Sequence, residues 1–507
     1  MTAALRSQVR ALAAPIRPLL RSRGWALMWL PTIPPPLLGL LFGSGGTPFR
    51  ICYVLAIAFL FAYCLILRNR PLVLVAGFLI WLTIERLVVA TMTDSLDQDT
   101  LRWLLAYKEF FFPFLLAVEL PRLRIAWRSA RPAVRFLDVC AVLFCALVTL
   151  AFVVGSAPLD DRLTYARRFA ELPLIYLAGR LLPVGAAQVR TIAAFMVAIA
   201  VPVAIFGFLE ITVLEGLVWR DVVPAVSYYH LSTLAGLSAP ASDWDFNGLP
   251  ILFWDYSFST AIRRLVSTFL EATTLAAFLA FTTALALSFW QRRKLAYAVA
   301  GVLGLATCLT LGKAGIVVLV GAGGYALVAA FWPALRRRVV VVVAGVAVVA
   351  GIFALVGIAI AANFTNGSLD HVRGFTEGLR SAAATPFGKG LGIGGNFGEV
   401  HTAAESSVGV ILLQIGLPGA LLWSLWLVGL AMVCADSGKA AGMHLAGLTL
   451  GIALLAFFAT AVFTESAGGL LGNWPYALVP AMLVGLLSGV APPVAPPSGR
   501  DGQVPAS

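Results

Sequence analysis

Charged residues are scarce in this chain. They make up 12% of its 507 residues, whereas hydrophobic residues make up 60% and the mean hydropathy is +0.92. Soluble globular proteins carry about 25% charged residues, so this composition excludes an ordinary soluble enzyme and a disordered chain. The sequence therefore predicts an integral membrane protein. At roughly 20 apolar residues for each span, it is long enough for a dozen or more spans.

Cysteine and histidine are also few, and neither follows a metal-binding pattern. All six cysteines lie in or beside apolar runs, so we interpret them as small buried side chains and expect neither a disulfide nor a zinc site. The four histidines have no metal-ligand spacing either. We expect no metal and no cofactor.

Apolar runs between polar breaks predict about fourteen transmembrane helices, so the expected fold class is an all-α polytopic membrane protein. The runs lie near 25–43, 51–67, 71–92, 103–120, 136–156, 169–183, 191–214, 264–290, 295–311, 314–333, 339–361, 405–432, 443–463 and 474–490. A basic segment, 1–24, precedes this membrane domain of 25–490. The Pro-rich stretch 491–507 is predicted to be a disordered cytoplasmic tail.

Basic residues gather in alternate loops and so predict the orientation. The chain has 36 Lys and Arg against 24 Asp and Glu, a net charge of +12. Short basic loops such as QRRK at 291–294 are expected in the cytoplasm, together with both termini. The expected location is the bacterial inner membrane. Two outer loops, 215–263 and 363–404, exceed 40 residues, and loops of this length are usually functional.

Opposite charges occur side by side within two predicted spans. Glu85 precedes Arg86, and Lys108 precedes Glu109. Neighbours on a helix point about 100° apart, so pairing across helices, Glu85 with Lys108 for instance, is expected rather than pairing within each dipeptide. A charge in the bilayer is costly and is normally paired or functional. We interpret these charges as structural pairs and assign no role to Glu210 and Glu271.

Further basic residues stand on the predicted outer side, where the orientation rule disfavours them. They are Arg167, Arg168, Arg263, Arg264, Lys313, Arg373, Arg380 and Lys389. Arginine's planar fork suits a pair of phosphate oxygens, so as a set they indicate an anionic partner. The alternative is contact with lipid headgroups or with loop acids such as Asp160.

The second long loop contains a glycine-rich stretch, PFGKGLGIGG at 386–395. It lacks the GK[ST] ending of a nucleotide-binding loop. It predicts either a backbone nest for an anion or a tight return of the loop into the protein. Glu405 follows at the start of the twelfth predicted span, where it is either a base or a helix-capping acid.

Four stretches in the C-terminal half resemble the O-antigen ligase and Wzy-type polymerase superfamily of bacterial glycan-assembly membrane enzymes. They are RRLVSTFLEATTLAAFLAF from Arg263, LTLGKAGIVVL from Leu309, RSAAATPFGKGLGIGG from Arg380 and ESSVGVILLQIGLPG from Glu405. Two positions depart from the family pattern: Lys313 stands where the family often has Arg, and Glu405 stands where many members have His.

The resemblance implies an inverting, metal-independent glycosyltransferase of the C-type class. Its activity would be polymerisation of polyprenyl-diphosphate-linked oligosaccharide repeat units into an exopolysaccharide, capsule or O-antigen at the outer face. The residues implied as holding the diphosphate are Arg264, Lys313, Arg380, Arg373 and Arg168. The base that activates the acceptor hydroxyl would be Glu405, with His371 and His401 as competitors.

The resemblance also implies partners and leaves alternatives open. Membrane lipids, a chain-length regulator and a flippase are expected partners, and nucleic acid is not. A ligase that moves a finished glycan to a lipid or protein acceptor would share every motif. From a different class, a lipid-linked-sugar transporter or flippase would also have many spans and buried charges. The sequence does not separate polymerase from ligase.

Overall fold

The computed structural model describes a mainly helical chain. The residues it describes are 14, 16, 24–43, 45–214, 216–233, 245–246, 248–250, 253–255, 261–290, 294–332, 366–394, 406–463 and 470–487.

Within the described residues, eight helices are long and apolar enough to cross a membrane, so the chain is a multi-pass, all-α membrane protein. They are α5 (Gly46–Leu67), α6 (Pro71–Ala90), α10 (Pro132–Val154), α12 (Ala186–Thr212), α14 (Ala272–Phe289), the run of α16 (Lys313–Val318), η9 (Leu319–Gly323) and α17 (Gly324–Phe331), then α21 (Gly416–Ala440) and α22 (His444–Phe463). The expected number of fourteen spans is not confirmed.

The remaining helices are shorter or more polar. They are α3 (Gly24–Met28), α4 (Pro34–Phe42), α7 (Gln98–Ala106), α8 (Phe111–Glu119), α9 (Leu123–Ser129), α11 (Leu159–Leu181), α13 (Ala225–Thr233), α15 (Lys294–Leu309), α19 (Asn366–Ala384), α20 (Ser407–Gln414) and α23 (Leu470–Gly485). Short 3-10 or π turns join several of them: η1 (Leu30–Thr32), η2 (Thr93–Ser95), η3 (Tyr107–Phe110), η4 (Leu120–Arg122), η5 (Val218–Val222) and η8 (Ser267–Phe269).

Three predicted spans are interrupted helices. The run 25–43 is divided by η1, where prolines remove backbone donors. The run 103–120 is divided by η3, and 405–432 is divided between α20 and α21, where Gly416 has a φ of 79°. The predicted span 339–361 lies outside the described residues.

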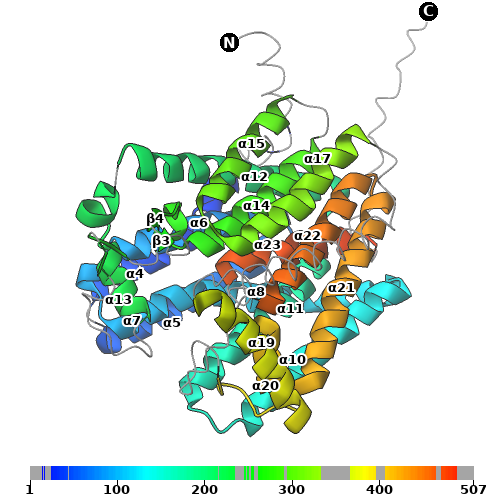
Figure 1. The fold of residues 1–507 in the computed structure, drawn as a ribbon, viewed down its shortest axis with the longest axis horizontal. Helices are drawn as coiled ribbons and strands as arrows, with labels where there is room; N and C mark the ends of the chain where they lie inside the picture. Colours follow the sequence, from blue (N-terminus) through cyan, green and yellow to red (C-terminus); the bar gives the residue numbers. More distant parts are fainter. Residues whose placement is uncertain are drawn as a thin grey trace, which may run out of the picture.

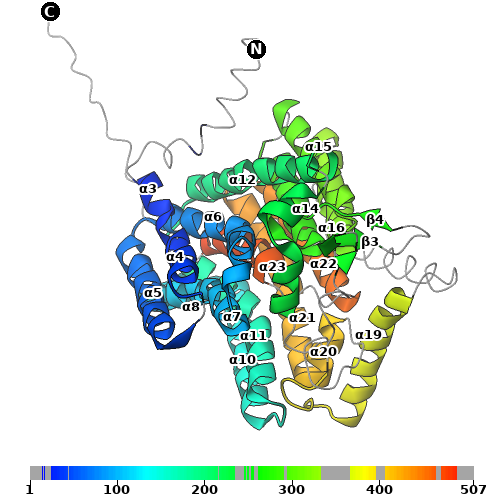
Figure 2. The same ribbon diagram turned by 90° about the vertical axis from the view of Figure 1, so that its left-hand side faces the viewer.

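Helix α14 lies at the centre of the fold. It packs against α12 and α15 on one side and against α22 and α23 on the other (Figure 1). In the most apolar stretch of α14, 78% of the residues are buried. The corresponding share is 83% in α22 and only 33% in α5. Helix α5 therefore lies at the periphery, where its apolar side chains are available to lipid, and it stands at the edge of the ribbon in Figure 2.

The described parts of the two long loops contain regular secondary structure. The first contains η5, α13 and two short antiparallel ladders, β1 (Asp245–Phe246) with β2 (Leu249–Pro250) and β3 (Trp254–Asp255) with β4 (Ile262–Arg263). The second contains α19, which packs on α20 (Figure 2). The stretch after α19 returns into the protein beside the turn between α10 and α11, where Leu391 N donates to the Ala151 carbonyl.

Candidate functional site

A buried ion pair joins α6 to η3. Lys108 Nζ lies 2.8 Å from Glu85 Oε1, and neither side chain is more than 9% exposed. The pairing expected from the sequence is therefore confirmed, although a 3-10 turn rather than a continuous helix carries the lysine. Taking a charge out of water costs free energy, and in this pair each charge compensates the other. Removing either partner would therefore leave the other charge buried and unpaired.

The next residue on α6 reaches a different partner. Arg86 Nη1 lies 2.5 Å from Glu271 Oε2 and 3.2 Å from the Phe269 carbonyl oxygen. Burial opposes the charge on Glu271, but Arg86 and neighbouring threonine hydroxyls lower its pKa to about 2. Glu271 is thus an ionised anchor at the start of α14. With so low a pKa it is also a weak base.

A third pair joins η3 to α11. Arg167 Nη1 lies 3.0 Å from Glu109 Oε2. Arg168 and Glu171, also on α11, lie within electrostatic range of this pair. Arg167 is therefore tied to an acid of η3, and not to the loop acids considered from the sequence. Its neighbour Arg168 remains beside the pair as a further positive charge.

These three pairs form a single row. Glu109 follows Lys108 in the chain and Arg86 follows Glu85, so each adjacent pair of residues links two ion pairs. We define the charge row as Arg167, Glu109, Lys108, Glu85, Arg86 and Glu271. Electrostatic contact with Glu271 extends it to Arg264. The row runs from α11 through η3 and α6 to the start of α14.

Arg263 anchors the segment that leads into α14. Its guanidinium lies 3.6 Å from Glu210 Oε1 and stands over the ring of Phe253, 4.7 Å from its centroid. The fully buried Glu210 carboxylate also accepts the backbone N–H groups of Val266 and Ser267 at 3.0 and 2.9 Å. Arg263 and Glu210 therefore shape this turn, which gives Glu210 the structural role that the sequence left open.

Arg264 contacts a different neighbour, the turn that precedes α16. Its Nε donates to the Thr310 carbonyl at 2.9 Å, three residues before Lys313. Lys313 is exposed at the first turn of α16. Among the described residues, the two terminal nitrogens of Arg264 make no hydrogen bond. The hydrogen bond from Nε fixes the orientation of the guanidinium and leaves its two terminal nitrogens available to an anion.

The other two predicted arginines lie on α19. Arg373 and Arg380 are both exposed. Another face of this helix packs closely on α20, because the absence of side chains at Gly374, Gly378 and Gly409 lets the two backbones meet. Convergence of Arg380 with Arg264 and Lys313 on one pocket stays a prediction.

The glycine-rich stretch uses its backbone donors internally. Lys389 N donates to the Leu413 carbonyl at 2.9 Å, and Gly390 N donates to the Gln414 carbonyl at 3.0 Å. Gly390 has a φ of 91°, and a Cβ there would lie 2.5 Å from Gly155 Cα. Close approach to α10 explains the glycine, so the contacts favour a tight return of the loop over an anion nest.

The candidate bases are mostly outside the described residues. Glu405 and His401 lie there, and of His371 the structure describes only its place in the backbone of α19. Ser406 is the N-cap of α20, since its hydroxyl accepts the Gly409 N–H at 2.9 Å. The capping role considered for Glu405 therefore belongs to the next residue.

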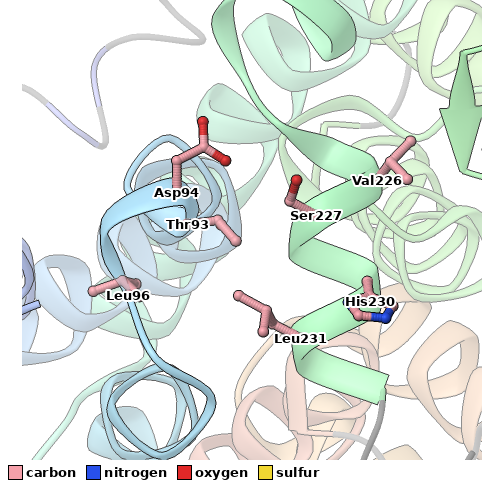
Figure 3. Close-up of a pocket in the computed structure, with 7 residues that line it drawn as sticks. All are labelled: Thr93, Asp94, Leu96, Val226, Ser227, His230 and Leu231. Carbon is pink, nitrogen blue, oxygen red and sulfur yellow. The ribbon is translucent and has the colours of Figure 1, made fainter. Parts of the chain in front are cut away.

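A hollow of about 300 Å³ lies between η2 and α13. Figure 3 shows Leu231 from α13 opposite Leu96 and Ser227 facing Thr93, and His230 is a further residue that lines the hollow. Neighbouring Tyr228 and Tyr229 of α13 lie within electrostatic range of Arg86. Helix α13 thus has one side on this hollow and another near the charge row.

The partnership of Arg86 with Glu271 was missed from the sequence, because 185 residues separate the two. The available signal was the position of each charge inside an apolar run. Comparison with protein-family models and with curated proteins gives no match. The family resemblance therefore remains an expectation from the four stretches that carry it.

Proposed function

We propose that this protein polymerises polyprenyl-diphosphate-linked oligosaccharide units into an exopolysaccharide, capsule or O-antigen at the outer face of the bacterial inner membrane. The observation that carries the proposal is the pair Arg264 and Lys313. One is a guanidinium that contacts the turn before α16 through Nε and has two terminal nitrogens available, and the other is an exposed ammonium on the first residue of α16. Together they suit a diphosphate.

In the proposed reaction the donor's diphosphate lies on this turn. An acceptor hydroxyl, deprotonated by Glu405 or by His371 or His401, attacks the anomeric carbon of the donor. The bond from that carbon to the diphosphate oxygen breaks with inversion, and negative charge grows on the leaving diphosphate. Fixed positive charges stabilise that growing charge, and such electrostatic stabilisation is usually the largest catalytic contribution. Arg168, Arg373 and Arg380 are the further cations we assign to this donor.

The charge row supports the proposal because its last member, Glu271, fixes the start of the helix that follows Arg264. Glu271 pairs with Arg86, and both Asp255 and Glu271 lie within electrostatic range of Arg264, so these acids balance part of the positive charge before the donor binds. Glu271 is held by Arg86 at 2.5 Å and by the Thr273 hydroxyl at 2.9 Å, which fixes the start of α14. A preorganised site of this kind loses little free energy to reorganisation when the substrate arrives.

The length and location of lipid-linked oligosaccharides in a deletion strain test the proposal. Loss of a polymerase leaves single repeat units on the carrier at the outer face. Loss of a ligase leaves long chains on the carrier, and loss of a flippase leaves units at the inner face. Single outer units restored to polymer by the wild-type chain support the proposal, and either of the other two patterns overturns it.

A further inference from the structure

Helix α9 is a short basic segment at the end of the fold that carries the α5–α6 turn. Between Leu120 and Phe136 the sequence has five arginines and no acidic residue. Arg122 donates to Asn69 in the α5–α6 turn at 3.3 Å, and α10, a candidate span, begins at Pro132. The ends of three apolar spans therefore lie beside α9, which places it at the depth of lipid headgroups.

Two arginines from other helices fix α9 to the protein. Arg135 donates to the carbonyl oxygens of Trp127 at 3.0 Å and Arg128 at 2.9 Å, and Arg180 donates to that of Ala126 at 3.3 Å. These bonds satisfy carbonyls that the end of a helix normally leaves free. Arg180 is itself fully buried and paired with Asp138 at 2.8 Å. Helix α9 is thus a fixed platform.

The outward face of this platform combines cations with apolar side chains. Arg124, Arg128 and Arg131 are exposed, and among the described residues none of them pairs with a carboxylate. Ile125 is 58% exposed and Trp127 is 39% exposed. Arginine beside exposed Trp and Ile is typical of a segment that lies in the membrane interface.

We propose that α9 and the turn after it form a binding site for the headgroups of anionic phospholipids. Arg124, Arg128 and Arg131 contact the headgroup phosphate through charge-assisted hydrogen bonds, and Ile125 and Trp127 lie at the acyl boundary. Basic sites between helix ends are known lipid-recognition features. This inference is independent of the proposed function, because it rests on none of the residues assigned to the donor.

Native mass spectrometry of the full chain in detergent, titrated with phosphatidylglycerol or phosphatidylcholine, tests the site. The variant is Arg124→Gln with Arg128→Gln and Arg131→Gln. The control has the same loss of charge at exposed arginines elsewhere, Arg50→Gln with Arg102→Gln and Arg190→Gln. At about fivefold for each arginine near an anionic surface, the α9 variant should bind phosphatidylglycerol roughly 100-fold more weakly.

The control should keep wild-type affinity, and the wild type should prefer phosphatidylglycerol to phosphatidylcholine. Equal affinity of the α9 variant and the wild type, or no preference between the two lipids, overturns the proposal. So does an equal loss in the control, which would show a general effect of net charge. The single variant Arg128→Gln, with an expected loss of about fivefold, gives the same test if the triple variant does not fold.

Discussion

Lys108 Nζ and Glu85 Oε1 lie 2.8 Å apart in the interior of the fold, and 23 residues separate them in the chain. Their nearest sequence neighbours, Glu109 and Arg86, pair with Arg167 and Glu271. The three ion pairs are therefore linked along the chain through two pairs of adjacent residues. The alternation keeps every charge in this region next to an opposite charge, which limits the cost of burial.

The first prediction concerns this central pair. Lys108→Met alone or Glu85→Gln alone should lower the free energy of unfolding by about 3–5 kcal/mol, because each leaves a buried charge unpaired. The double variant, Glu85→Leu with Lys108→Met, should recover much of that loss, since it removes both charges. Thermal unfolding of the purified chain in detergent measures this. A double variant less stable than both single variants would contradict it.

The second prediction separates two adjacent arginines. Arg264→Ala should lower the rate of glycan transfer by roughly 10- to 150-fold at normal protein level, since a charge-assisted phosphate contact is worth about 1.5–3 kcal/mol. Arg263→Ala should lower the protein level instead, because it leaves Glu210 without its cation. Polymer length and membrane protein level are measured together. Full transfer in Arg264→Ala would remove this residue from the donor site.

The sequence predicted contacts between residues on successive segments of the chain. Glu85 and Lys108 lie on successive apolar segments, so a short connection makes them neighbours. Arg86 and Glu271 have no such connection, and their contact depends on how α14 packs beside α6. The amino-acid sequence alone does not show which residues of two helices meet when the helices pack together. The interruption of the helix at η3 (Tyr107–Phe110) was also missed, because the apolar residues on both sides of it, Leu101 to Ala106 and Phe111 to Glu119, made one span of the whole run.

The glycine-rich stretch shows a second limit. Its composition fitted either an anion nest or a tight return of the loop. Only the acceptors of its N–H groups distinguish the two, and these acceptors lie on α10 and α20. Likewise, the sequence offered Glu405 as a helix-capping acid, whereas the N-cap of α20 is Ser406. The two residues are adjacent in the chain, but one caps a helix and the other is the candidate base.

The third prediction tests the docking of that stretch. Gly390→Ala should destabilise the protein strongly, since its Cβ would meet Gly155 Cα at 2.5 Å and its φ is 91°. Gly442→Ala is a matched control, because Gly442 also has a positive φ, 67°, but a Cβ there meets nothing within 4 Å. The control should lose only about 1–2 kcal/mol of backbone strain. Equal melting temperatures for the two variants would contradict the close packing.

The fourth prediction is the orientation. In a background without cysteine, Ser368→Cys and Ser242→Cys should react with a membrane-impermeant thiol reagent in intact cells, because both lie in predicted outer loops. Ser129→Cys, at the end of α9, should react only after the cells are opened. Ser129 is exposed, so failure to react would not reflect burial. The reverse pattern would invert the topology and place the α9 site at the outer leaflet.

The last prediction concerns the base. Glu405 directly precedes the N-cap of α20, and Gly409 of that helix meets α19, which carries Arg373. Nearby cations would keep a carboxylate ionised and able to accept a proton from a sugar hydroxyl. Glu405→Gln should therefore retain folding and donor binding but lose transfer, because Gln keeps the shape and removes the proton affinity.

Three companion variants make the assignment of the base specific. His401→Ala and His371→Ala should have milder effects on transfer than Glu405→Gln. Ser406→Ala should cost about 1 kcal/mol of stability, the usual value of an N-cap, and leave transfer nearly normal. Transfer is measured as polymer formed per unit of protein, and stability as the melting temperature in detergent. Normal polymer from Glu405→Gln with a loss in His371→Ala would move the catalytic role to the histidine, because an imidazole on α19 would then be the group that takes the proton.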